Sequence, residues 1–106
     1  MASLQEFKNI ELKVAQIKEV NDHPNADRLY VISVDLGDKC KQIVAGIKKS
    51  YNKEELVGKQ VVVVDNLEPA LLRGIESQAM LLATEDDEGI CIVSPERKTK
   101  LGSIVK

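Results

Sequence analysis

The chain contains few aromatic residues and no tryptophan. Its three aromatic side chains are Phe7, Tyr30 and Tyr51. Proteins that bind single-stranded nucleic acid without sequence preference stack successive bases on aromatic side chains. Extensive base stacking is therefore excluded as the main source of any nucleic-acid binding, and phosphate, sugar and shape contacts are left as the alternative.

Histidine and cysteine are equally scarce, because His23, Cys40 and Cys91 are the only residues of these types. The cysteines are far apart and fit no metal-binding spacing, so we expect free thiols, buried or half-buried, with no metal and no cofactor. The enzymatic alternative is a cysteine nucleophile with His23 as its base. Lone thiols at strand positions disfavour it, and we interpret the chain as non-catalytic.

The sequence also lacks long apolar segments. No run of about 18 apolar residues is present, and residues 1–7 lack the basic and apolar regions of a signal peptide. Hydrophobic residues nevertheless make up 43% of the chain, enough for a core. We expect one cytoplasmic domain over residues 1–106, with no membrane partner.

The net charge of −2 does not suggest a nucleic-acid-binding protein, since such domains are usually basic. The charge is unevenly distributed, however. Residues 39–53 contain Lys39, Lys41, Lys48, Lys49 and Lys53 and no acidic residue, whereas residues 85–88 are all acidic. This pattern predicts a face with a positive field, with an ordinary solvated surface as the alternative.

Apolar alternation and turn residues predict mainly short strands. The alternation over residues 11–20 slips once, which indicates a strand with a bulge near Ala15–Gln16, although the spacing also permits a short helix. Asn52 and Glu55 form a capping-box pattern for a one-turn helix at 52–56. A helical turn is also expected at 4–9, and further strands at 28–36, 41–47, 59–65, 80–84 and 90–93.

A helix between the third and fourth strands predicts an all-β fold, namely a five-stranded Greek-key OB barrel. The strands at 80–84 and 90–93 and the tail to Val105 would form a C-terminal hairpin and extension. Residues 66–79 lie between two apolar strands and are interpreted as a polar loop at the rim of the sheet. Such loops carry binding contacts because a rigid scaffold holds them.

Several ordered motifs resemble one known family. Residues 23–31 are similar to the H-P-N-A-D-K/R-L-Y-V segment of the tRNA-binding domains appended to methionyl-tRNA synthetases, and of free-standing structure-specific tRNA-binding proteins. Residues 66–82 resemble the signature N-L-x-P-x-x-x-R-G-x-x-S-x-x-M-L-L of that family. Residues 51–57 match its Y-x-x-E-E-L-x helix, and the similarity extends from about Phe7 to the C-terminus.

This resemblance implies an OB fold that binds tRNA by shape and backbone and has no catalysis of its own. Members usually form homodimers, as a free-standing beta subunit or as the C-terminal domain of the synthetase. The implied partners are tRNA, a second copy of the chain and the catalytic chain of methionyl-tRNA synthetase. Family cousins that resemble export chaperones use the same scaffold with an apolar groove, so a peptide-binding module is the alternative.

The matched positions imply a set of tRNA-binding residues. Arginine and lysine suit phosphate, and methionine offers a soft apolar platform. Within the fold, Arg28 could instead pair with Asp27 or Asp35, Asn25 could bond its own turn, Ser77 and Gln78 could bond the loop to itself, and Met80 could be core. The implied set is Asn25, Arg28, Lys41, Asn66, Arg73, Ser77, Gln78 and Met80.

The chain also departs from the family pattern. Relatives often carry lysine at the positions of Glu68 and Leu71. Fewer lysines near the phosphates predict weaker binding with a flatter dependence on salt.

Overall fold

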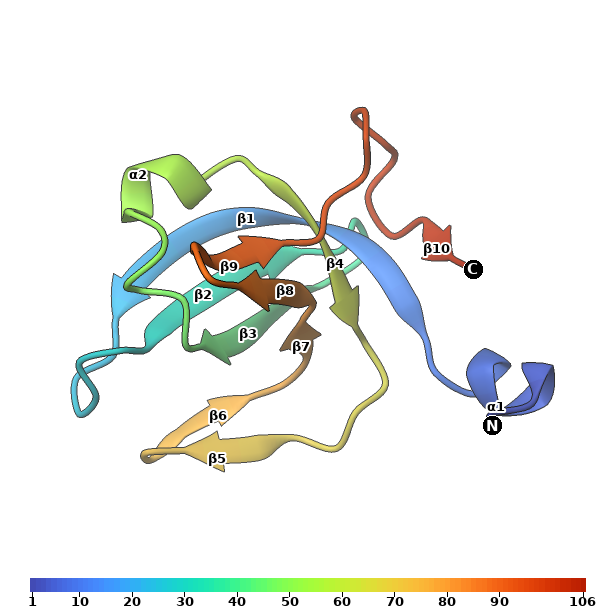
Figure 1. Cartoon of the computed structure of the whole chain (residues 1–106), viewed down its shortest axis with the longest axis horizontal. Coiled ribbons are helices and arrows are strands. Elements are labelled where there is room, and N and C mark those ends of the chain that lie inside the picture. The colour runs from blue at the N-terminus through green and yellow to red at the C-terminus, as the bar shows by residue number, and fades with distance from the viewer.

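The computed structural model describes residues 1–106, which form two one-turn helices and ten strands (Figure 1). Both helices lie where the sequence predicts them. The helices are α1 (Leu4–Lys8) and α2 (Lys53–Leu56), and the strands are β1 (Leu12–Asp22), β2 (Tyr30–Asp35), β3 (Cys40–Ala45), β4 (Gln60–Val64), β5 (Ala70–Leu72), β6 (Ile75–Ser77), β7 (Met80–Leu81), β8 (Ala83–Asp86), β9 (Gly89–Ile92) and β10 (Ile104–Val105).

The main sheet has the strand order β3-β2-β1-β4-β7, and all neighbours in it are antiparallel. The long β1 pairs with β4 over residues 12–16 and with β2 over residues 16–22, so one strand belongs to both halves of the barrel. The β8–β9 hairpin and β10, which pairs with the start of β1, form the C-terminal extension. With α2 between β3 and β4, this arrangement confirms the predicted OB barrel.

The barrel is closed between β3 and the segment that joins β6 to β7. The backbone N–H of Gln78 donates to the Gln42 carbonyl at 2.7 Å, and the Gln78 side-chain Oε1 accepts the Gln42 N–H at 2.9 Å. The Ser77 hydroxyl accepts the Val44 N–H at 3.0 Å. Side chains thus replace part of a strand ladder at this seam and satisfy the free edge of β3.

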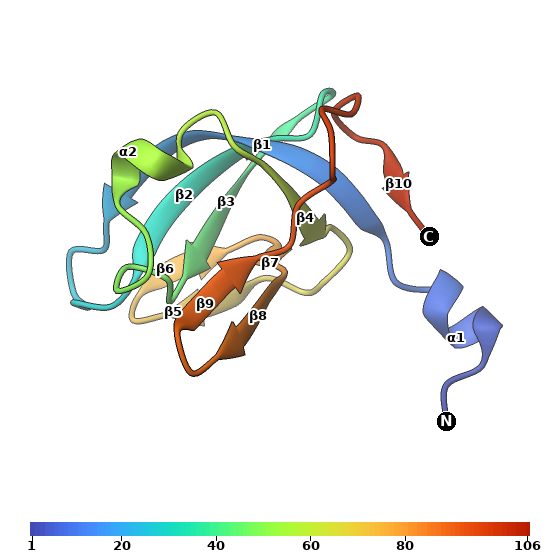
Figure 2. The same ribbon diagram turned by 45° about the horizontal axis from the view of Figure 1, so that its top comes forward.

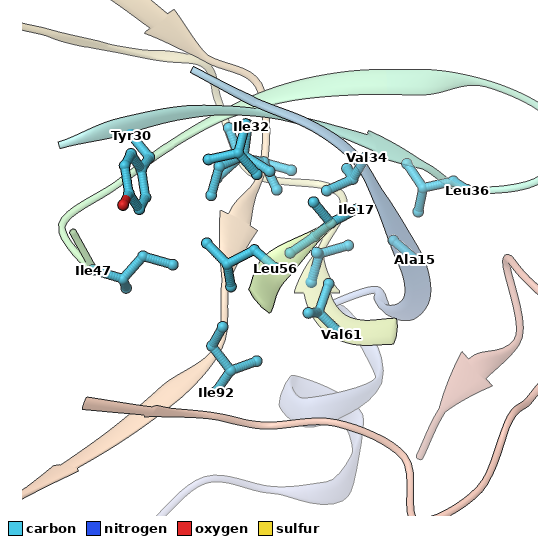
Figure 3. Close-up of a cluster of buried hydrophobic side chains, with 14 residues drawn as sticks. Ala15, Ile17, Tyr30, Ile32, Val34, Leu36, Ile47, Leu56, Val61 and Ile92 are labelled. Carbon is cyan, nitrogen blue, oxygen red and sulfur yellow. The ribbon is translucent and has the colours of Figure 1, made fainter. Parts of the chain in front are cut away.

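The core fills the inside of the barrel with inward side chains of β1, β2, β3, β4 and β9 (Figure 3). Ala15 of β1 pairs with Val61 of β4, and both are fully buried, as are Ile17 and Val63. Leu56 of α2 is also fully buried and lies among the strand side chains. Burying such a side chain contributes about 2 kcal/mol, so α2 covers one end of the barrel and is held there by packing.

The bulge in β1 lies between Ile17 and Glu19, two residues after its predicted position at Ala15–Gln16. Ala15 is small but fully buried, so the inward alternation continues through Ile17 and slips only afterwards. The extra residue returns Val20 to the inside, where it pairs with Ile32. The segment is a strand throughout, and the helical alternative was wrong.

The predicted strand at 80–84 is two separate strands. β7 ends at Leu81 and β8 begins at Ala83, because Leu82 turns the chain out of the main sheet. Its N–H still donates to the Val62 carbonyl at 3.0 Å, while its carbonyl accepts the Val93 N–H at 3.1 Å. The interruption lets one segment serve the barrel and then the extension.

The predicted polar loop at 66–79 contains a second hairpin, β5–β6. Ala70 pairs with Ser77 and Leu72 with Ile75, around a turn at Arg73–Gly74. The interpretation of residues 66–79 as a loop therefore missed two paired strands. The hairpin was missed because its strands have three residues each and an arginine occupies the first turn position, where Asn, Asp or Gly is typical.

Helix α1 stands away from the barrel, and none of its residues is buried (Figure 2). A capping box holds it, since Ser3 Oγ accepts the Glu6 N–H and Glu6 accepts the Ser3 N–H. Phe7 is exposed and does not belong to the core.

Cys40 and Cys91 are free thiols, as expected, but both are exposed, so their predicted burial was wrong. Each lies on a strand at a position that faces away from the core.

The two helices of the chain are far too short to cross a membrane.

Candidate nucleic-acid interface

The β5–β6 turn holds an arginine in an unfavourable backbone conformation. Arg73 has φ 53° and Gly74 has φ 90°, the two positive angles of a type I′ turn. Arg73 is the only residue other than glycine with a positive φ, and that conformation costs a residue with a Cβ roughly 1 kcal/mol. An outlier of this kind, exposed at a hairpin tip, points to a functional reason for the arginine.

His23 joins the loop between β1 and β2 to this hairpin. Its Nδ1 accepts the Asn25 backbone N–H at 2.9 Å, so the ring proton lies on Nε2, which donates to the Leu72 carbonyl at 2.9 Å. The ring is buried. Both nitrogens are engaged, and His23 is therefore not available as a base for Cys40 or Cys91.

Asn25 and Arg73 extend the same junction through two longer hydrogen bonds. The Asn25 amide donates to the Arg73 carbonyl at 3.4 Å, and the Arg73 guanidinium donates to the Asn25 carbonyl at 3.3 Å. Residues 23–28 and 71–75 thus form one continuous surface, the hairpin–loop tip. The two segments are in direct contact.

Arg28 lies at the end of this loop and is exposed. It forms no ion pair with Asp27 or Asp35 in the structure, and Asp35 instead accepts the Gly37 N–H. Its guanidinium is consequently free for a ligand.

Three residues of the implied set are occupied inside the protein. Asn66 clamps the start of β1, because its Oδ1 accepts the Glu11 N–H at 2.8 Å and its Nδ2 donates to the Asn9 carbonyl at 2.7 Å. Ser77 is buried and also donates to the Ala79 carbonyl at 2.9 Å. With Gln78 bonded to β3, these side chains shape the surface instead of presenting free polar groups.

Met80 is half exposed on β7, opposite Val64. It lines two shallow depressions of about 290 Å³ and 170 Å³, together with Val44, and Leu72 lines the smaller one. Leu71, on the nearby hairpin, is exposed. A flexible thioether beside exposed apolar groups can adapt to an apolar ligand surface.

The aromatic side chains offer no stacking platform at the tip. The Tyr30 hydroxyl donates to the Tyr51 carbonyl at 2.8 Å, and the Tyr51 hydroxyl accepts the Ile92 N–H at 3.0 Å. Both rings are therefore fixed to neighbouring backbone.

Lys41 lies at the other end of the barrel, in a group that we call the Asp65 cluster: Lys13, Lys39, Lys41 and Asp65. The three ammonium nitrogens approach the Asp65 carboxylate to 2.8, 3.1 and 2.7 Å, respectively. Lys41 also donates to the Asp65 backbone carbonyl at 2.7 Å. No group of three or more His, Cys, Asp and Glu side chains is placed to hold a metal.

The electrostatics of the Asp65 cluster follow from burial and charge. Burial alone would raise the pKa of Asp65, whose side chain is 3% exposed. Hydrogen bonds from Lys13, Lys41 and Lys39 outweigh this effect and hold the pKa well below its usual range. The hydrogen bond to Asp65 likewise raises the pKa of Lys13. Both shifts favour the charged forms of Asp65 and Lys13.

Sequence reasoning included Lys41 but missed Lys13, Lys39 and Asp65. The alternation of inward and outward positions along a strand could have identified two of them. Lys13 shares the inward parity of Ala15, and Asp65 that of Val63. A charge at an inward strand position needs a partner of opposite charge. The pairing of Lys13 with Asp65 could therefore have been predicted from the sequence.

Comparison with known proteins identifies relatives of this chain. The model of the putative tRNA binding domain family matches residues 12–104. Methionine–tRNA ligases of Thermococcus kodakarensis and Pyrococcus furiosus are 55% and 52% identical to it over 104 residues. Those residues are 98% of this chain, which spans only 14% of the length of either relative.

Solved structures share the whole fold. A MetRS related protein from Pyrococcus horikoshii is 30% identical, with a TM-score of 0.92 over all of this chain and 98% of the other. The CsaA chaperone protein from Picrophilus torridus is 27% identical, with a TM-score of 0.94 over the whole of both chains. Two differently named groups therefore share this scaffold.

Proposed function

The chain belongs to the putative tRNA-binding domain family, and we propose that it binds tRNA at the hairpin–loop tip without catalysing a reaction. Arg73 is the observation that carries this proposal. A residue held at φ 53° on an exposed tip, where asparagine or glycine is conformationally easier, is explained by what its guanidinium binds.

The chemistry of the tip suits the RNA backbone. Arg73 uses one N–H in a 3.3 Å bond to Asn25, and the remaining donors of its fork are free for a phosphate. Arg28 supplies a second cation, and the Asn25 side chain supplies a polar group between them. Met80 offers an apolar contact to one base or ribose. Without an aromatic platform, such contacts recognise shape and backbone more than base sequence.

The relatives suggest the context of this binding. We propose that the chain raises the local concentration of tRNA for a methionyl-tRNA synthetase catalytic chain, as a linked domain or a separate subunit, during protein synthesis in the cytoplasm. Linkage of two binding modules increases apparent affinity through effective concentration alone.

A second copy of the chain is the other proposed partner. Leu4, Phe7 and Ile10 on and beside α1 are exposed, and Ile104 on β10 is 72% exposed. No residue of helix α1 is buried within the chain (Figure 2). We propose that these apolar groups are covered in a symmetric homodimer, and the mass of the chain in solution tests this directly.

Peptide binding is the second candidate function. The depressions beside Met80 and the exposed Leu67, Leu71 and Leu72 give the same region an apolar character. A relative of this fold is named as a chaperone. An unfolded polypeptide would use these depressions and leave Arg73 without a role.

Filter binding with labelled tRNA at low and moderate salt separates the two functions. We expect tRNA binding that weakens as salt rises, because each neutralised phosphate releases counterions. A reduced, unfolded polypeptide serves as competitor. If the wild-type chain fails to bind tRNA at low salt, or if the polypeptide displaces tRNA at lower concentration than tRNA displaces itself, tRNA binding is the wrong assignment.

A further inference from the structure

The Asp65 cluster contains more positive charge than the fold needs. Asp65 is a single carboxylate, and Lys13 and Lys41 already pair with its two oxygens at 2.8 and 2.7 Å. Lys39 is a third cation on the same group, at 3.1 Å. We propose that the Asp65 cluster is a second phosphate-binding site for the RNA backbone, distinct from the hairpin–loop tip. This inference rests on the proposed tRNA binding.

Hydrogen-bond donors remain available in the cluster. Three ammonium groups provide about nine N–H donors, and the contacts with the Asp65 carboxylate and carbonyl engage four of them. Glu11 lies 3.7 Å from Lys13, which is beyond hydrogen-bond distance. Even with Glu11 counted, the lysines outnumber the acids, so the site keeps a positive charge and free donors for an anion.

The buried carboxylate positions these donors in advance. The Asp65 side chain is 3% exposed, whereas the side chains of Lys13, Lys39 and Lys41 are 21%, 41% and 22% exposed. The lysines therefore contact Asp65 on one side and solvent on the other. A free lysine loses rotamer entropy on binding, and lysines already ordered by Asp65 lose less.

A cleft beside the cluster is lined by charged residues and also by Ile104, which the proposed homodimer would cover. Its volume is about 840 Å³, and Lys13 is shared between it and the cluster. Its other charged residues are Lys100, Lys106 and Asp38. Because Lys13 already belongs to the cluster, the cleft adds Lys100 and Lys106 against Asp38, which is one further positive charge along the surface.

The strand topology fixes the distance between the two sites. The loop of residues 23–28 precedes β2, and the turn that carries Lys39 follows it, so the two lie at opposite ends of the six residues of β2. At about 3.3 Å per residue, this corresponds to roughly 20 Å. A folded RNA that spans this distance engages both sites, which is a physical basis for recognition by shape.

Lys39 gives the cleanest test because it is the most exposed and least needed of the three lysines. We expect Lys39→Gln to weaken tRNA binding about tenfold at low salt, equivalent to about 1.4 kcal/mol, and to reduce the slope of log affinity against log salt by about one. Lys39→Arg keeps the charge and should retain both values. Lys18→Gln is the matched control, since Lys18 is exposed on β1 and forms no ion pair in the structure.

Thermal melts of all variants show whether each is folded under the binding conditions, and Lys13→Gln provides a second reading of the same site. If Lys39→Gln and Lys13→Gln bind tRNA with the affinity and salt slope of Lys18→Gln, the cluster is structural only and the inference is overturned. If the wild-type chain itself does not bind tRNA at low salt, the proposed function fails and this inference fails with it. The two results are distinguished by the wild-type titration.

Discussion

The two ends of the barrel position their cations by different physical means. At the hairpin–loop tip, a neutral histidine and backbone groups hold two loops together, and Arg73 projects from a turn whose geometry is fixed. At the Asp65 cluster, a buried carboxylate holds three lysines by charge. Hydrogen bonds between neutral groups depend little on salt, whereas ion pairs weaken as salt rises. A single small fold therefore carries one site set by backbone geometry and one set by electrostatics.

Replacing Asp65 should affect this comparison most. Asp65→Asn leaves three ammonium groups around a neutral amide, and we expect a loss of about 2–3 kcal/mol in the free energy of unfolding at neutral pH. Asp22→Asn is the matched control. Asp22 also accepts two lysines, Lys48 at 3.1 Å and Lys53 at 3.0 Å, but its side chain is half exposed, and its loss should change stability little. Equal effects in urea unfolding would show that burial is not what distinguishes Asp65.

The same variant predicts a dependence on pH. The folded-state pKa of Asp65 lies below its unfolded value of about 3.9. As pH falls below about 4, the unfolded state binds the proton first, and the stabilisation that is present at higher pH is progressively lost. The difference in stability between wild type and Asp65→Asn should therefore be constant above about pH 5 and should shrink below pH 4. A constant difference down to pH 2 would contradict the ion-pair account.

Replacing His23 tests the other end of the barrel. His23→Leu leaves the Leu72 carbonyl and the Asn25 N–H without partners, and we expect a loss of about 1–2 kcal/mol because water can reach part of this surface. His23→Asn can still accept the Asn25 N–H and should lie between Leu and wild type. Urea unfolding at low and high salt measures both. A loss that varies strongly with salt would mean that charge also holds the tip.

Arg73→Asn should have the smallest effect on stability. Unlike the Asp65 and His23 variants, it should stabilise the protein. Asn-Gly is a favoured type I′ pair, so we expect stability to rise by about 0.5–1 kcal/mol while tRNA affinity falls. Arg73→Lys, which keeps the charge but not the easier turn, is the control. An Asn variant that binds tRNA as well as wild type would remove the functional explanation for the strained arginine.

The barrel itself could be predicted from sequence because its signals are local. Val61 to Val64 are apolar on both faces, and Asn52 and Glu55 have the spacing of a helix cap, as found when Glu55 accepts the Asn52 N–H at 2.7 Å. These patterns depend on neighbours in the chain. They identified the elements, and their order then identified the fold.

The candidate site was predicted less completely because its partners are distant in sequence. Nothing near Ser77 shows that its hydroxyl will accept a hydrogen bond from the Val44 N–H, and nothing near Asn66 shows that it will bond the Glu11 N–H. In the sequence, a polar residue that bonds the seam therefore cannot be distinguished from one that binds a ligand. Arg73 was identified through its match to the family signature, but the left-handed conformation that makes it informative exists only in the folded hairpin.

The seam at Ser77 and Gln78 has a consequence for the motions of the barrel. A strand ladder opens by unzipping several backbone bonds together, whereas a bond to a side chain breaks when one rotamer changes. The amides of Gln42 and Val44 depend on such bonds. We therefore expect the barrel to open transiently at this seam. The amides of Gln42 and Val44 should exchange faster than those of β1. Loosening of this kind would move the β5–β6 hairpin without unfolding the protein.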